Sequence, residues 1–242
     1  MKKMMQKLAE VTLFFNFLLL YNYKLYNMTN ILGIDVGVKN LALSIVECDK
    51  VEKFKIKNYW LIDLNEKPKC KECDKPSIKF NFNLGEIIYC CKAHADNMTK
   101  KIKERNIEEK VNYLIKKLDE ILINTNYSLV VIENQPSFRS PHMKSIQIAL
   151  LTYFLMKNKN VKFQNPSSKV YNHKFEKVNK NYLYRETKKF GIMLAEKLFD
   201  LKEIKEKYRK IDDICDSLLI CVSEFMEHKP PKLIAPFIKT KN

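Results

Sequence analysis

The sequence is short of acidic residues, of glycine and of long apolar runs. It has 28 Asp and Glu against 44 Lys and Arg, so the net charge is +16, and the excess is spread along the whole chain. A surface of this kind favours a polyanionic partner, nucleic acid ahead of an anionic membrane, over a merely soluble basic protein. Glycine occurs only four times, so each position calls for a structural reason: Gly33, Gly37, Gly85 and Gly191.

The apolar run near the N-terminus, VTLFFNFLLLY, is too short to span a membrane. It has about a dozen residues, whereas a membrane helix needs roughly 18, and no small-residue cleavage site follows it. We therefore expect no stable membrane association. Residues 1–27 are interpreted as an expendable leader or extension, with a targeting segment or a docking helix as alternatives. Met28 precedes the first predicted strand and is a candidate for the true start.

Seven cysteines are an odd number, and four of them are clustered, which is unlike a secreted disulfide framework. The cluster begins with a C-x-x-C pair and, after a hairpin-like segment, ends with two adjacent cysteines and a histidine. This spacing is typical of a structural zinc site with four soft ligands, and the alternative is a reduced cluster without metal. The predicted ligands are Cys70, Cys73, Cys91 and His94, with Cys90 as the alternate for Cys91.

Hydrophobic periodicity predicts an α/β fold with a mixed sheet. Residues 31–47 form a strand, a tight turn and an antiparallel strand, and residues 51–64 continue as a third strand that is half exposed. A Cys-rich segment at 68–96 follows. The remaining predicted elements are a helix at 98–123, a strand at 128–134, a helix at 143–156, a strand at 161–166, a helix at 190–199 and a last helix at 212–227.

Acidic residues at three separate places along the chain are candidates for a metal site. Asp35 lies in an otherwise apolar strand, and Glu133 ends a strand predicted to run parallel beside it. Asp213 and Asp216 are three residues apart and share one helix face. Carboxylates that converge repel one another, and divalent metal is the usual resolution. Taken singly, each has a simpler interpretation: a turn-forming Asp, or helix N-terminal acids favoured by the helix dipole.

Three segments, at 35–47, 130–140 and 212–222, resemble the acidic motifs of RuvC-type Holliday junction resolvases, which belong to the ribonuclease H-like superfamily. The resemblance is to the resolvases of large DNA viruses, poxviruses and their kin, and of fungal mitochondria. It runs from about residue 31 to residue 227, with Asn40, Gln135 and Arg139 as further matching details. It implies that Asp35, Glu133, Asp213 and Asp216 are catalytic residues that bind Mg²⁺ or Mn²⁺.

The resemblance also implies the domain organisation and the activity. A ribonuclease H-like domain with a mixed five-stranded sheet flanked by helices would span residues 28–228, with a zinc-binding insertion at 68–96 and a basic tail at 229–242. The implied activity is a structure-specific DNA endonuclease that resolves four-way junctions by two-metal phosphodiester hydrolysis, in recombination and repair. The implied partners are branched DNA and a second copy, as a homodimer.

The location implied is intracellular: the infected-cell cytoplasm if the protein is viral, otherwise mitochondrion or nucleus. Resolvases of large cytoplasmic DNA viruses carry a similar insertion, whereas the poxvirus branch departs from it. Two alternatives stay open: a non-catalytic nucleic-acid-binding protein on the same scaffold, and a related nuclease for RNA–DNA hybrids. The filled acidic positions argue against the first, while the sequence separates the substrates of the second poorly.

A basic segment at 169–189 interleaves lysine with tyrosine and phenylalanine, as a nucleic-acid groove would. The alternative is a solvated amphipathic helix with its aromatic side chains buried. His173 is left out of the predicted site, and Asp212 is interpreted as a helix cap or a solvated charge. The predicted phosphate contacts are Arg139, Lys169 and Lys188.

Overall fold

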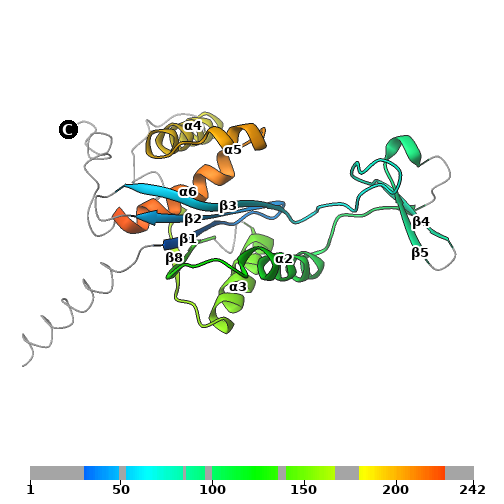
Figure 1. The fold of residues 1–242 in the computed structure, drawn as a ribbon, viewed down its shortest axis with the longest axis horizontal. Coiled ribbons are helices and arrows are strands. Elements are labelled where there is room, and N and C mark those ends of the chain that lie inside the picture. The colour runs from blue at the N-terminus through cyan, green and yellow to red at the C-terminus, as the bar shows by residue number, and fades with distance from the viewer. Residues whose placement is uncertain are drawn as a thin grey trace, which may run out of the picture.

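A five-stranded mixed sheet forms the centre of the molecule (Figure 1). The structure is a computed structural model that describes residues 30–48, 53–83, 86–95, 100–135, 140–166 and 180–226. The sheet order is β3-β2-β1-β7-β8; β1, β2 and β3 are antiparallel neighbours, and β7 and β8 continue the sheet in parallel with β1. The predicted mixed five-stranded sheet is therefore confirmed. Its strands are β1 (Asn30–Asp35), β2 (Asn40–Cys48), β3 (Phe54–Asp63), β7 (Leu129–Glu133) and β8 (Val161–Gln164).

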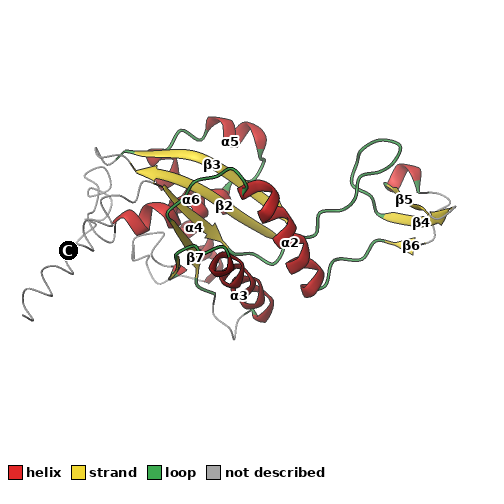
Figure 2. Cartoon of the chain, turned by 60° about the horizontal axis from the view of Figure 1, so that its bottom comes forward, coloured by secondary structure: helices red, strands yellow, loops and turns green. Residues whose placement is uncertain are grey.

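Helices cover both faces of this sheet (Figures 1 and 2). Alternation along β1 divides the core, because Ile31 packs with one helix layer while Leu32 and Ile34 pack with the other. No helix within the described ranges combines the length and apolar character needed to cross a bilayer. The first layer consists of α4 (Lys180–Leu198), the short α5 (Lys202–Lys207) and α6 (Asp212–Met226), and the second of α2 (Ile107–Leu122) and α3 (Pro141–Met156).

The close approach of α6 to the sheet depends on a glycine. A Cβ atom on Gly33 would collide with the Ser217 carbonyl oxygen and would lie 2.6 Å from Cys221 Sγ. Ser44, on the neighbouring strand, pairs its hydroxyl with that of Ser217 at 2.5 Å, and both side chains are buried. The backbone of α6 therefore lies directly on β1 and β2, which explains one of the scarce glycines.

A second, three-stranded sheet follows β3 and projects away from the main sheet (Figure 1). Its order is β5-β4-β6, and β4 and β5 form the hairpin that the sequence predicted. We call residues 69–101, which carry this sheet and the cysteine cluster, the insertion module. Its elements are β4 (Lys79–Asn83), β5 (Glu86–Cys90), the 3-10 helix η1 (Lys92–His94) and β6 (Lys100–Lys101).

Two helix predictions need correction, and one helix was not predicted. The helix predicted from residue 98 begins at Ile107, because Asn106 and Glu109 form a reciprocal capping box at its start, and residues 100–101 are a strand instead. The helix predicted at 190–199 is the end of the longer α4, and the polar helix α5 was not predicted. The predictions for residues 1–27 and 229–242, and for Arg139, Lys169 and His173, lie outside the described residues.

The glycine contacts predict opposite outcomes for two alanine substitutions. Gly33→Ala should lower the free energy of unfolding by about 1–3 kcal/mol, because the new methyl group meets helix backbone. Gly191→Ala should be neutral or stabilising, since its Cβ would lie 3.5 Å from the nearest atom and alanine favours the helix. Urea unfolding followed by circular dichroism measures both, and equal stability of Gly33→Ala and wild type would contradict the packing described.

Candidate active site and metal centre

Asp35 and Glu133 end adjacent parallel strands at the same edge of the sheet. The register pairs Ile34 with Ile132, so the next residue on each strand is the carboxylate. Gly33 and Val131 face the α6 layer, and side chains two residues apart share a face of a strand. Asp35 and Glu133 therefore both lie on the α6 side of the sheet, and the predicted parallel pairing of their strands is confirmed.

Helix α6 brings a third carboxylate to this edge. Cys221 donates its thiol to the Ile31 carbonyl (3.4 Å), and one turn earlier Ser217 lies against Gly33. The helix thus runs antiparallel to β1, and four helical residues rise about 6 Å, close to the span of two strand residues. Asp213 lies one further turn back on the same helix face, so this register carries its position on α6 toward the level of Asp35.

Asp216 lies beside this group, in the seam between α6 and α4. A Cβ atom on Gly191 of α4 would stand 3.5 Å from Asp216 Oδ1, in ordinary van der Waals contact, so this carboxylate lies close to the α4 backbone. Both Asp213 and Asp216 are half-buried. Within the described residues, no three of the four carboxylates form a group whose ligand atoms all lie within 4.8 Å of one another. The fold brings together the strands and the helix that carry the carboxylates, but the carboxylates do not form one compact cluster.

Hydrogen bonds position the buried Glu133. Gln135 donates its side-chain amide to Glu133 Oε2 (3.0 Å) and also lies 3.5 Å from the Val36 carbonyl. The Gln135 backbone N–H in turn donates to Gln147 Oε1 on α3 (2.9 Å). Gln135 links the ends of β1 and β7 and fixes the Glu133 carboxylate, which gives a role to a residue that the sequence offered only as a matching detail.

Lysines meet the acids at the start of α6. Lys188 Nζ pairs with Asp212 and lies 3.6 Å from Asp213 Oδ1, and Lys210 Nζ lies 3.2 Å from Asp212 Oδ2 and 3.8 Å from Asp213 Oδ2. The interpretation of Asp212 as a solvated charge was wrong, because its side chain is 7% exposed and ion-paired. Lys188 lies at the acidic site itself. Lys210 was not predicted, although it stands two residues before Asp212 in the sequence.

Opposing effects act on the pKa of Asp212. Burial raises the pKa of this carboxyl, but the hydrogen bond and the charge of Lys188, with help from Lys210, outweigh burial and hold it below its usual value. For Lys188, burial lowers the pKa and the pairing with Asp212 raises it, with a net upward shift. Both partners are therefore charged at neutral pH.

The cysteine cluster brings together the four residues predicted as ligands. One ligand atom from each lies within 4.8 Å of all the others, while the alternate residue, Cys90, is buried outside this set. A hydrogen bond from the Cys91 backbone, aided by His94 against the effect of burial, lowers the pKa of the Cys70 thiol to about 6. The thiolate is the form that binds metal. The four are Cys70, Cys73, Cys91 and His94, so this cluster could hold a metal ion.

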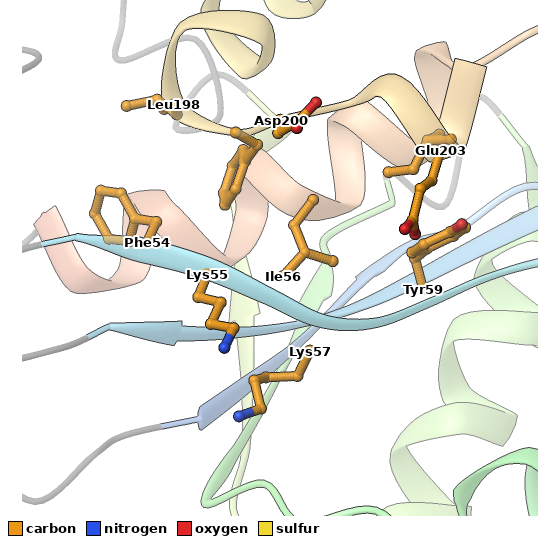
Figure 3. Close-up of a pocket in the computed structure, with 10 residues that line it drawn as sticks. Phe54, Lys55, Ile56, Lys57, Tyr59, Leu198, Asp200 and Glu203 are labelled. Atoms are coloured by element: carbon orange, nitrogen blue, oxygen red, sulfur yellow. The ribbon is translucent and has the colours of Figure 1, made fainter. Parts of the chain in front are cut away.

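A separate hollow of about 410 Å³ lies at the edge strand β3, between that strand and α5 (Figure 3). Phe54 and Ile56 line it together with Asp200 and Glu203, and none of the predicted site residues does. Phe54 pairs with the last residue of β2, so this hollow lies toward the end of the sheet opposite Asp35. We do not assign it to the acidic site.

The comparisons with known proteins agree with this geometry. The profile of the family described as "Poxvirus A22 protein" matches residues 29–228. The chain belongs to this family. The uncharacterized protein L451 of Acanthamoeba polyphaga mimivirus is 31% identical over 182 residues, which is 60% of this chain and 44% of that protein. The chain thus spans less than half the length of this curated relative.

Solved structures share the fold. The yeast mitochondrial Holliday junction resolvase Ydc2 has a TM-score of 0.51 at 18% identity, over 88% of this chain and 86% of that chain. The fowlpox virus resolvase, solved with substrate Holliday junction DNA, has 0.50 at 21%, over 83% and 99%. T. thermophilus RuvC with a Holliday junction substrate has 0.50 at 14%, over 84% and 97%. The resemblance predicted from the acidic motifs is confirmed for family and fold.

The ion pairs of Asp212 predict a pH-dependent loss of stability in one lysine variant. Lys188→Met should lower the free energy of unfolding by about 1–3 kcal/mol at pH 7, because a buried carboxylate loses a partner. The low pKa of Asp212 contributes stability above the unfolded value near 4, and this contribution is lost as pH falls through the folded pKa. The difference in unfolding free energy between wild type and Lys188→Met should therefore become smaller as the pH is lowered through about 4.

The neighbouring Lys189→Met is the matched control. Lys189 pairs with Glu186 on the surface and its side chain is 73% exposed, so its loss should leave stability nearly unchanged. Urea unfolding at several pH values measures both variants. If Lys188→Met and Lys189→Met behaved alike across the range, the proposed importance of the buried pair would be wrong.

Proposed function

We propose that this chain is a metal-dependent endodeoxyribonuclease that resolves four-way DNA junctions. The observation that most supports the proposal is that Asp35 and Glu133 end adjacent parallel strands at one edge of a RuvC-type sheet, with α6 carrying Asp213 toward that edge. A group of acidic residues on a chain of net charge +16 suits a nuclease, because the surface attracts phosphate while the acids hold cations. Fowlpox resolvase and RuvC were both solved with junction DNA, and we extend that substrate to this chain.

The donor chemistry fits Mg²⁺ or Mn²⁺. Asp35, Glu133, Asp213 and Asp216 offer only carboxylate oxygens, which these hard cations prefer. Two such cations, when bound, activate water and stabilise the leaving oxygen of a phosphodiester. The chain's own residues supply position and charge: Gln135 fixes Glu133, and Lys188 neutralises Asp212 beside Asp213. Lys210, whose side chain is 68% exposed, can meet a substrate phosphate at the rim.

We further propose a homodimer and a structural zinc ion. A four-way junction has two-fold symmetry and needs one incision on each of two strands, so two copies of the chain would supply one active site for each incision. The thiol and imidazole donors of Cys70, Cys73, Cys91 and His94 match the tetrahedral preference of Zn²⁺ and leave no open position. Zinc would then serve the fold of the insertion module and not the chemistry.

Removal of one carboxylate should separate cleavage from binding. Asp35→Asn should reduce the cleavage of a synthetic four-way junction in Mg²⁺ by at least about a hundredfold, because a cation ligand is lost. Binding of the same junction in Ca²⁺ should persist. Gel assays of cleavage and binding measure both effects, with linear duplex and an RNA–DNA hybrid as competing substrates.

Asp119→Asn is the control, since Asp119 lies on α2 and pairs with Lys157 on the opposite side of the sheet. It should cut as fast as wild type. Undiminished cleavage by Asp35→Asn would refute the site, and preference for the hybrid would redirect the proposal to a different nuclease.

Loss of a thiol should remove zinc. Cys70→Ser should lower the zinc content from about one ion per chain to near zero and reduce the melting temperature. Cys90→Ser should keep its zinc, because Cys91 completes the ligand set, and Cys48→Ser should also keep it. Metal analysis of the purified proteins decides the point, and wild-type protein without zinc would remove this part of the proposal.

A further inference from the structure

One face of the small sheet in the insertion module carries aromatic side chains. Phe80 and Phe82 lie two residues apart on β4 and so share a face. Their cross-strand partners on β5 are Tyr89 and Ile87, and Phe80 also pairs with Lys100 on β6. Residues paired across strands lie on the same side, so all five occupy one surface. We call Phe80, Phe82, Ile87, Tyr89 and Lys100 the aromatic face.

The aromatic face is not needed for the core of the module. The opposite face carries Ile88 and Cys90, which pack with the cysteine cluster. Phe82 is 56% exposed and Ile87 is 45% exposed, and no element in the described part of the chain covers them. Phe80 contacts the rings of Phe82 and Tyr89 at 5.9 and 6.1 Å. The result is a row of rings in contact, open to solvent at the Phe82 end.

The charge around this face suits nucleic acid. The Lys100 ammonium lies 4.8 Å from the Phe82 ring centre and 5.9 Å from that of Phe80. Residues 68–103 contain eight lysines and four acidic residues. Protein interfaces are depleted of lysine, whereas surfaces that bind single strands combine rings for the bases with cations for the phosphates. The composition of this face therefore favours bases over a protein partner.

The module also lies on the appropriate side of the main sheet. Asp63, the last residue of β3, pairs with Asn40, while Asp35 pairs with Ala42. The strand that leads into the module therefore leaves the sheet at the edge where the proposed catalytic carboxylates lie. Figures 1 and 2 show the module extending outward from this edge. DNA held at the carboxylates would have arms directed along the module.

We propose that the aromatic face binds unpaired bases at the crossover of branched DNA, with Phe82 stacking on a base and Lys100 contacting the adjacent phosphate. This inference rests on the proposed function only for the identity of the branched substrate. The stacking itself is a property of the module, because bases of any sequence present a ring face. An opened crossover and a single strand offer the same chemistry, so either can serve as a probe.

Substitutions at Phe82 test the stacking. We use full-length protein with a fluorescent four-way junction and a single-stranded dT oligonucleotide, in Ca²⁺. Phe82→Ala should weaken both affinities about fivefold to a hundredfold, and Phe82→Trp should restore them. Phe82→Leu, which keeps an apolar side chain without a ring, should bind as weakly as Phe82→Ala. Ile123→Ala, at a side chain that is 78% exposed at the C-terminal end of α2, is the control and should bind as wild type.

The outcomes separate this inference from the proposed function. Equal binding of Phe82→Ala and wild type overturns it, and cleavage of junctions by wild type would still support the nuclease. Full affinity in Phe82→Leu, or a change in oligomeric state of Phe82→Ala by light scattering, assigns the face to protein contact and also overturns it. If Phe82→Ala loses affinity for the single strand and the wild type cuts no junction, the result supports the stacking and argues against the nuclease. A wild type that binds neither probe overturns both.

Discussion

The direct contact between the backbone of α6 and β1 sets the position of the candidate active site. Gly33 permits this contact, and the hydrogen bond between the hydroxyls of Ser44 and Ser217 stabilises it. Because the helix lies antiparallel to the strand, its register on the sheet decides which of its residues reach the end of β1. A larger residue at 33 would lift the helix and move Asp213 away from Asp35. The geometry of the acids thus follows from the absence of one side chain.

Much of the fold and of the candidate site was predictable because its signals are local in the sequence. A carboxylate inside an apolar strand, as at Asp35, or at the end of one, as at Glu133, stands out against its neighbours. The C-x-x-C spacing identifies the cysteine cluster in the same way. The pairing of Asp212 with Lys188 was not predictable, because the two residues lie on different helices and no sequence periodicity links them. The aromatic face was not predicted either, because only strand pairing shows that Phe82, Ile87 and Lys100 share a surface.

The chain separates two kinds of donor that prefer different metals. Carboxylate oxygens occupy the edge of the main sheet, while thiols and an imidazole occupy the insertion module. Hard and soft ligands on distinct structural units reduce competition for the wrong ion. Lys188 and Lys210 belong to the first unit, where they pair with acids at the start of α6. Lys100 belongs to the second unit, where it lies over aromatic rings.

The two chain segments that join the insertion module to the main domain are tied together at their base. Arg105 donates a guanidinium hydrogen bond to the Leu64 carbonyl (3.0 Å), so the chain leaves and re-enters the domain at nearly one point. Segments with adjacent ends can be gained or lost between related proteins with little disturbance to the host fold. Melting of the module after metal loss would likewise stay confined beyond Arg105. Such an appendage could be exchanged during evolution while the sheet edge that carries Asp35 and Glu133 stays unchanged.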